Sequence, residues 1–214
     1  MSVAPIDYPV RLGLDAPVRM ARWRPFVNWL LAVPHGIITY ALGVLREALL
    51  FVSFFAVLFT KAIPRPLFDM VAMTYRYQWR FVSYALFLRE VYPRFDFTPA
   101  SEDVVTDPAT YAIDYPVELD RWKPLYKWFL AIPHFIVLLG LWIAAFAVSL
   151  AAAFVVLFTN EYPQGMRDFV VGVMRWQMRV EAYVLFLTDV YPPFTLHSTA
   201  QTPTVALPPP LTSQ

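Results

Sequence analysis

Two sets of charged residues recur at one spacing, and they are the side chains best suited to binding chemistry. The sets are Asp69, Arg76 and Arg80 in the first half of the chain, and Asp168, Arg175 and Arg179 in the second. On a helix, spacings of seven and four residues bring three side chains within about 40° of one another. Guanidinium groups suit phosphate geometry, so each stripe is a candidate site for an anionic lipid headgroup or another acidic ligand. A structural role is favoured over this one, with each side chain bonding a carbonyl or a residue of the other copy, because Asp69 and Arg76 lie about 10 Å apart on an ideal helix.

Two histidines also occupy equivalent places, each directly after a proline. We expect His35 and His134 to be structural rings that donate to a backbone carbonyl, with metal binding or proton relay as the alternative. No third ligand stands at short spacing, and the chain has no cysteine. Only six glycines occur, and the motifs GxGxxG, Walker A, GxSxG and HExxH do not appear. The sequence therefore predicts no catalytic residue, no metal site and no cofactor.

These residues belong to a unit that occurs twice. Residues 22–95 align with residues 121–194 at a constant shift of 99 positions, with about 30 of roughly 74 positions identical. The stretch between the copies is acidic and turn-rich, and the C-terminal tail is rich in Pro, Ser and Thr. We expect a first membrane repeat over 1–97, a water-exposed cytoplasmic linker over 98–112, a second membrane repeat over 113–194 and a disordered Pro-rich tail over 195–214.

The composition points to lipid. Of the 214 residues, 58% are hydrophobic and only 15% are charged, against about 25% charged in ordinary soluble domains. Aromatic residues reach 17%. The formal net charge is +1, and no Lys/Arg-rich block is present, which argues against a nucleic-acid partner.

Tryptophans and basic residues cluster just before each apolar run. Such a composition suits the headgroup layer, where indole rings anchor and cations meet lipid phosphates. The expected interfacial anchors are Arg22, Trp23, Arg24 and Trp29 in the first copy, and Arg121, Trp122, Lys123 and Trp128 in the second. Pro34 and Pro133 are expected to break or redirect the chain after each cluster.

The apolar runs that follow are long enough to span a membrane. Residues 135–159 carry no charge, and a span needs about 20 apolar residues. The corresponding run, 36–60, contains Arg46 and Glu47. We expect one or both to face a neighbouring helix or a small wet cavity, with a substrate or proton pathway as the alternative. Residues 66–91 and 165–190 carry the charged stripes, so each segment either crosses the bilayer or lies in its interface.

Charge distribution favours an even number of crossings per copy, because both basic clusters would then lie in the cytoplasm. The expected fold class is all-α and integral to the membrane: two tandem repeats, four transmembrane helices with short interfacial segments, and both termini cytoplasmic. One crossing plus an interfacial helix per copy, or a hairpin that dips into the bilayer and returns, are the alternatives.

The phrase IDYPV opens each copy, at residues 6–10 and 113–117. Pro9 and Pro116 favour an extended conformation at the preceding tyrosine, so we expect a short strand or clamp on the headgroup layer. Asp7 and Asp114 are expected to pair with the basic clusters.

The blocks RWKPLYKWFLAIPH, VVLFTNEYPQGMRDFVVGVMRW and LTDVYPPF resemble the bacterial membrane family known as domain of unknown function 4389. The second copy matches this pattern throughout residues 114–194. The first copy departs from it at 62–65, Met70, Ala72 and Arg94. The resemblance implies a membrane protein, and it implies no catalytic residue, substrate or cofactor. The expected location is the bacterial inner membrane, with several crossings.

The function expected from these features is that of a non-enzymatic accessory, scaffold or lipid-interacting subunit. Its expected partners are membrane lipids, including anionic ones, and a larger membrane complex or further copies of the chain. One alternative is a transporter or channel subunit with a polar seam between the repeats. Another is a lipid-modifying enzyme that uses Asp69 and Asp168 with His35 and His134.

Overall fold

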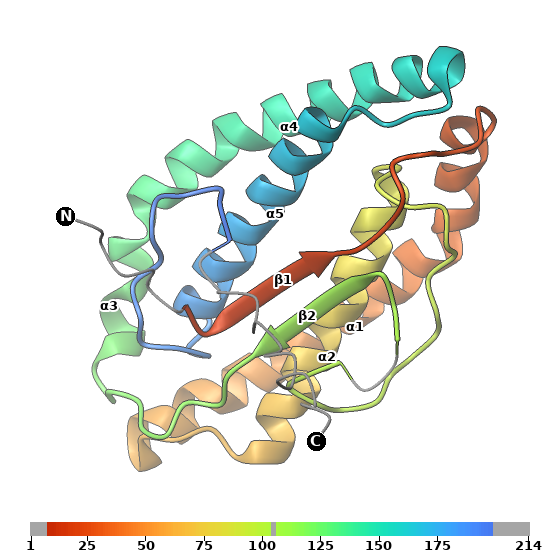
Figure 1. The fold of residues 1–214 in the computed structure, drawn as a ribbon. Helices are drawn as coiled ribbons and strands as arrows, with labels where there is room; N and C mark the ends of the chain where they lie inside the picture. The colour runs from red at the N-terminus through yellow and green to blue at the C-terminus, as the bar shows by residue number, and fades with distance from the viewer. Residues whose placement is uncertain (1–7, 104–105, 199–214) are drawn as a thin grey trace, which may run out of the picture.

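The computed structural model describes residues 8–103 and 106–198. Each repeat folds into a helical hairpin, and a small β-ribbon lies across both hairpins (Figure 1). The elements in chain order are β1 (Val10–Leu14), α1 (Arg24–Thr60), α2 (Arg65–Ala85), β2 (Ala109–Ile113), α3 (Lys123–Leu130), α4 (Ile132–Thr159) and α5 (Gln164–Val184). Helix α1 packs against α2, and α4 packs against α5.

The ribbon corrects the all-α prediction. Strands β1 and β2 pair antiparallel, with Val10 opposite Ile113 and Leu14 opposite Ala109. Alternate residues, such as Val10, Leu12 and Tyr111, point into the core, as the two-residue period of a strand requires. Only one residue of each IDYPV phrase enters a strand, so the phrase borders the ribbon. Asp7 lies outside the described residues, and Asp114 pairs with Arg11 instead of a basic cluster.

The two repeats are joined by reciprocal contacts. Strand β1 packs on α5 of the second repeat, and β2 packs on α2 of the first. The segments that lead into each helical hairpin also cross over: Met20 N–H donates to Asn160 O, and Leu119 N–H donates to Lys61 O. Met20 and Leu119 are equivalent under the repeat, as are Lys61 and Asn160. Each half of the chain is therefore completed by the other.

Proline acts differently in the two copies. Helix α1 continues through Pro34, whereas α3 ends at Leu130 and α4 begins with Pro133 in its first turn. A proline in the first turn loses no helical hydrogen bond, because that N–H has no partner there anyway. The expected break is therefore present in the second repeat and wrong for the first.

In both repeats a tyrosine hydroxyl donates a hydrogen bond to a helix carbonyl near the proline, where the proline itself supplies no N–H. Tyr92 donates to the carbonyl of Leu31, and Tyr191 donates to that of Leu130, at 3.3 and 3.2 Å. Each acceptor lies three residues before the proline, next to the carbonyl that the missing N–H leaves without its helical partner. The closing YP motif of each repeat thus supports the start of its long helix.

Among the described residues, α1 and α4 are the two helices long and apolar enough to cross a membrane, judged by length and composition. Both pack against the remainder of the fold along one side only, so large apolar side chains stay exposed along their lengths.

The expected exposed linker is wrong for several of its residues. Ser101 and Asp107 are buried, and residues 109–113 form β2. At the C-terminus, Leu196 packs against the core, and its side chain lies so close to Gly172 that a Cβ there would be 2.9 Å from Leu196 Cβ. The expected disordered tail is thus wrong for Leu196. From residue 199 onward it lies outside the described residues.

Candidate functional site

The arginines of the first stripe are buried against the segment between the repeats. The Arg76 guanidinium donates to the carbonyls of Thr98, Ala100 and Glu102 at 2.5–3.0 Å. Arg80 donates to Asp96 at 2.9 Å and to Asp103 at 2.7 Å. Both arginine side chains are only 1% exposed.

A further pair extends this cluster. Arg89, just after α2, pairs with Asp107, and the two side chains are 0% and 1% exposed. We call the whole group the buried ion network; it comprises Arg76, Arg80, Arg89, Asp96, Asp103 and Asp107. Because its guanidinium groups are taken up by carbonyls and carboxylates, the network supports the structural interpretation of the first stripe.

Two carboxylates of the network differ in pKa because their surroundings differ. Burial alone would raise the pKa of Asp96, but hydrogen bonds from the Thr98 hydroxyl and backbone N–H, together with the Arg80 guanidinium, lower it to about 2. At Asp103 burial prevails, and its pKa is raised although Tyr111 N–H, Arg80 and Arg76 all favour the charged form. The network therefore holds carboxylates that respond to acid at different pH values.

The second stripe meets the other repeat. Arg175 Nε donates to the carbonyl of Leu12 in β1 at 3.0 Å, and Arg179 donates to the carbonyl of Thr195. A cavity of about 260 Å³ beside α5 includes Arg167, Asp168 and Arg175 in its lining. In the first repeat, by contrast, Asp69 pairs with Arg65 at 3.0 Å, one turn away on the same helix. The structure therefore distributes the six stripe residues among separate contacts along the two sides of the ribbon.

The histidines are enclosed by aromatic rings. His35 Nδ1 lies 2.7 Å from the Tyr77 hydroxyl, and its ring stacks on Phe95 with centroids 4.4 Å apart. His134 Nδ1 accepts the indole N–H of Trp176 at 3.0 Å and stacks on Phe194 at 3.9 Å. Both histidines are fully buried. Their partners are side chains, so the expected bond to a backbone carbonyl is wrong, while the structural role stands.

Polar groups also gather where the two repeats meet. Arg46 donates to Gln78 Oε1 at 2.6 Å and lies over the Tyr75 ring at 4.3 Å. On the facing helix, Gln177 donates to Glu181 at 2.5 Å, and Arg46 attracts the Glu181 carboxylate. As expected, Arg46 faces a neighbouring helix, whereas Glu47 is exposed.

The expected interfacial tryptophans all lie at the surface: Trp23, Trp29, Trp122 and Trp128 are 51–61% exposed. The basic residues beside them have mixed contacts. Arg22 donates to Asn160 Oδ1 at 2.9 Å, Arg24 lies 3.7 Å from Glu90, and Lys123 lies 3.4 Å from Asp189.

Lys127, which follows the second cluster of expected anchors, is a buried basic residue. It binds Asp189 at 2.6 Å and the Thr188 carbonyl at 2.7 Å. Burial would raise the pKa of Asp189, but Lys127 and the backbone N–H of Asp120 lower it.

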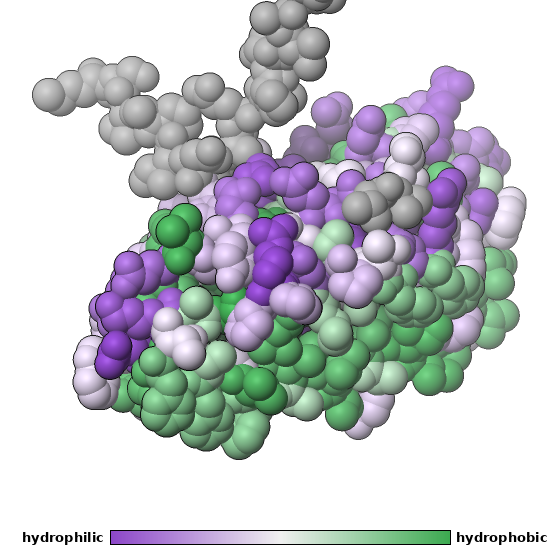
Figure 2. All heavy atoms as spheres, turned by 90° about the horizontal axis from the view of Figure 1, so that it is seen from below, coloured by the Kyte–Doolittle hydropathy of each residue, from purple (hydrophilic) through white to green (hydrophobic). Residues whose placement is uncertain are grey.

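The largest surface feature is an apolar face. In Figure 2 hydrophobic residues cover the lower part of the molecule, and polar residues gather at the upper part, which is the ribbon side of Figure 1. Its exposed side chains come mainly from α1 and α4 and include Phe26, Ile37, Phe51 and Phe59 on α1, and Ile136, Ile143, Phe146 and Phe158 on α4. A contiguous apolar area of this kind marks a surface for lipid or protein.

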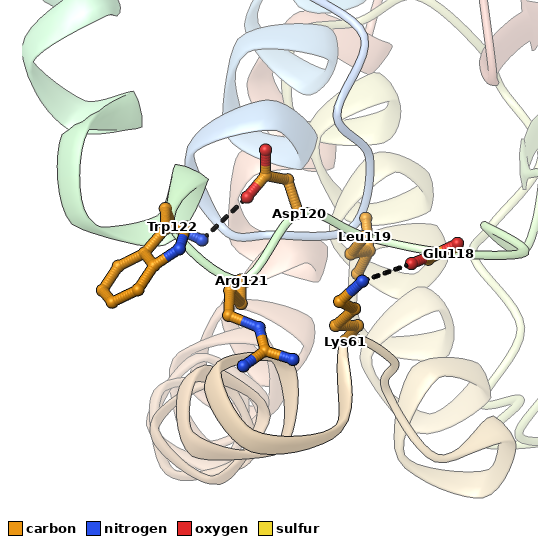
Figure 3. Close-up of a pocket in the computed structure, with 6 residues that line it drawn as sticks. All are labelled: Lys61, Glu118, Leu119, Asp120, Arg121 and Trp122. Atoms are coloured by element: carbon orange, nitrogen blue, oxygen red, sulfur yellow. Dashed lines mark hydrogen bonds and ion pairs between the residues drawn. The ribbon is translucent and has the colours of Figure 1, made fainter.

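A shallow cavity of about 630 Å³ lies at the end of α1 (Figure 3). It is lined by Lys61, Glu118, Leu119, Asp120, Arg121 and Trp122. Among the described residues, no group of three or more His, Cys, Asp or Glu side chains is arranged to hold a metal ion.

Several contact residues escaped the sequence analysis. Asp103 and Asp107 belong to the segment 98–112, which was expected to be exposed, and Asp96 lies just before it in the first repeat; Glu181 lies in α5 outside the predicted stripe. One signal was available: Arg89 aligns with Thr188, so the first copy carries an extra arginine where the neighbouring segment carries extra aspartates. That asymmetry between the repeats could have predicted the Arg89–Asp107 pair.

The fold and these surfaces define a protein made of two tandem helical units with one apolar face. The chain belongs to the family described as Domain of unknown function (DUF4389), whose model matches residues 22–96 and 121–195. The resemblance noted in the sequence, in two tandem copies, is thereby confirmed. No curated protein and no solved structure matches the chain significantly.

Proposed function

We propose that the protein is a non-enzymatic accessory or scaffold component of a membrane, attached through the apolar face of α1 and α4. The observation that carries this proposal is the two-sided distribution of side chains, with charges on the ribbon side and exposed aromatic and aliphatic residues on the helical side (Figure 2). Anionic and zwitterionic phospholipids are its proposed lipid partners, and a larger membrane complex its proposed protein partner.

The apolar residues of α1 form one continuous stripe. Phe26, Val33, Ile37, Val44 and Phe51 are each 49–67% exposed, and an ideal helix places them within about 40° of one another. Glu47 lies at the edge of this stripe, about 40° from Phe51. An apolar stripe opposite a packed side is the pattern of a helix that lies in the plane of a membrane.

The buried ion network favours this in-plane orientation over the four crossings expected from the sequence. The network lies along α2, and α2 packs alongside α1. If α1 crossed the bilayer, Arg76 and Arg80 would lie near hydrocarbon depth, where each arginine costs roughly 2.5–3.5 kcal/mol on insertion scales. Attachment by one face keeps the network and the ribbon in the headgroup layer and water.

The positions of the polar residues support a scaffold over a transporter. Arg76 and Arg80 bond with the segment at 96–103, whereas Arg46 bonds with Gln78 on another side of α2. These groups would have to converge to line one pathway. An enzymatic role is likewise not favoured, since His35 contacts Tyr77 and Asp69 contacts Arg65.

Flotation with phospholipid vesicles tests the attachment. Ile143→Glu with Phe146→Glu places two charges on side chains that are 66% and 67% exposed, so folding should be retained. We expect this variant to stay in the dense fraction, whereas Thr110→Glu, on the exposed side of β2, floats with the vesicles as the unmodified chain does. Flotation of the double variant at the unmodified level would contradict attachment through this face.

Affinity purification from membranes tests the scaffold role. A membrane protein recovered in fixed ratio to the chain, and lost from the Ile143→Glu, Phe146→Glu variant, would support it. Recovery of lipid without a protein partner would contradict the scaffold role, while the proposed attachment to the membrane would stand.

A further inference from the structure

The cavity at the end of α1 brings two cations to one place. Lys61 ends the helix in the left-handed conformation, with φ of 60°, and its carbonyl accepts the N–H of Leu119 at 2.9 Å. This bond holds the lead-in segment of the second repeat, with Arg121, beside the end of α1. Figure 3 shows the Lys61 ammonium directed to Glu118 and the Arg121 side chain extending from the neighbouring loop without a partner among the residues drawn.

Nearby acidic groups leave the Arg121 guanidinium accessible. The Asp120 carboxylate points away from it and accepts the backbone N–H of Trp122 at 2.9 Å (Figure 3). Glu118 pairs with Lys61 at 2.8 Å, but both side chains are well exposed, at 68% and 44%. Within the described part of the chain, Arg121 has no hydrogen bond or ion pair from its side chain, and the residue is exposed.

Exposed apolar residues continue from this cavity onto the two helices beside it. Trp122 is 61% exposed, Phe129 on α3 is 62% exposed, and Phe59 in the last turn of α1 is 73% exposed. An indole ring next to basic side chains and apolar surface is the arrangement found at headgroup level in membranes. The cavity therefore offers a place for a charged headgroup and a surface for the acyl chains behind it.

We propose that this cavity binds the phosphate group of an anionic phospholipid, with Arg121 as the bidentate donor, Lys61 as the second cation and the Trp122 ring beside the glycerol. The guanidinium fork fits two phosphate oxygens, and a neighbouring ammonium adds charge without geometric demand. This inference rests on the proposed attachment of α1 and α4 to a membrane, because only that orientation brings lipid to the cavity.

The repeat supplies an internal comparison. The equivalent junction in the first repeat has a cavity of about 370 Å³ that includes Arg22, Glu90 and Asn160 in its lining. There Asn160 stands in place of Lys61, and Arg22 donates to its side chain at 2.9 Å. The lining of this cavity also includes Arg19, which lies 3.4 Å from Glu161, so both arginines of the first-repeat cavity already have partners. We expect one phospholipid to bind tightly, at the Arg121 site.

Native mass spectrometry of the full chain in detergent, titrated with phosphatidylglycerol or phosphatidylcholine, tests the site. The unmodified chain should retain one phosphatidylglycerol in preference to phosphatidylcholine. Arg121→Ala should weaken that binding at least about tenfold, since a charge-assisted hydrogen bond pair is lost. The matched variant Arg22→Ala should leave it unchanged. Glu118→Gln should strengthen it, because Lys61 loses its competing partner.

Further arms separate the possible sources of the phosphate. Displacement of phosphatidylglycerol by an excess of inorganic phosphate would overturn the lipid assignment and indicate a free-phosphate site. Equal effects of Arg121→Ala and Arg22→Ala, or no effect of either, would overturn the site itself. Weaker phosphatidylglycerol binding in Glu118→Gln would also overturn the proposal, because it would show that the carboxylate does not compete with the phosphate for Lys61. Vesicle flotation distinguishes failure of the phosphate site from failure of the membrane attachment. If Arg121→Ala still floats but no longer prefers phosphatidylglycerol, the site is supported. If the unmodified chain does not float, the proposed attachment, on which the site rests, is wrong.

Discussion

Removal of the Asp107 carboxylate should strongly destabilise the fold. Asp107 pairs with Arg89, both side chains are at most 1% exposed, and Asp107 also accepts the N–H of Ala109 at the start of β2. Loss of one partner from a buried ion pair costs about 3–5 kcal/mol, because the other charge stays buried without compensation. For a chain of this length each kcal/mol lowers the midpoint of thermal unfolding by about 2–4 °C. We therefore expect Asp107→Ala to lower it by about 6–20 °C.

The assay is thermal unfolding in detergent, followed by circular dichroism, with Asp114→Ala as the control. Asp114 pairs with Arg11 in the same ribbon, but the two side chains are 51% and 34% exposed. Such a surface pair contributes roughly 0–1 kcal/mol, so the control should shift by at most about 4 °C. Replacing Arg89 and Asp107 together by leucine should recover part of the loss, because no charge then stays buried alone.

Equal shifts for Asp107→Ala and Asp114→Ala would refute this reasoning. That result would mean that the segment between the repeats is solvated, as the sequence alone suggests, and that the buried ion network does not form.

Three further perturbations test other parts of the fold. Gly172→Ala should destabilise the protein by about 1–3 kcal/mol, because the added Cβ would lie 2.9 Å from Leu196 Cβ. Gly140→Ala is the control, because a Cβ at that position meets no atom within 4 Å. The thermal unfolding midpoint should therefore fall for the first variant and not for the second. Asp96 has its pKa lowered from 3.8 to about 2, so its contribution to stability is present above about pH 3.8 and is lost as the pH falls toward 2. The stability difference between the unmodified chain and Asp96→Asn should therefore shrink over that interval, and a constant difference would contradict the assignment. Fragments 1–105 and 106–214 should co-purify in equal amounts when expressed together, because strands and lead-in segments are exchanged between the repeats; independent migration on a sizing column would contradict that exchange.

The repeat and the long apolar helices could be predicted because each depends only on the order of residues along the chain, not on contacts formed after folding. A constant shift aligns the copies without a gap, and a charge-free run such as 135–159 has few alternatives to a long helix. The reciprocal packing could not be predicted in the same way. It depends on which surfaces meet after folding, and the contact of Met20 with Asn160 spans 140 positions of sequence.

The stripes show the same limit. Their spacing predicts that three polar side chains share one face of each helix, but it does not predict what that face contacts. Arg76 donates to carbonyls of the neighbouring segment, and Arg175 donates to the carbonyl of Leu12 in the other repeat. The segment between the repeats looked solvated because its composition is acidic, and it is packed because buried arginines need those acids.

Labelling of single cysteines introduced into the cysteine-free chain can show whether the molecule is attached to the membrane by one face. The positions are Thr110 on the ribbon, Lys61 and Glu161 in the two hairpin turns, and Phe51 in the apolar stripe of α1. A membrane-impermeant maleimide, applied to sealed vesicles of defined orientation, should label the first three from the same side and leave Phe51→Cys protected until detergent is added. Labelling of Lys61→Cys and Glu161→Cys from the side opposite to Thr110→Cys would contradict attachment by one face and support crossing helices.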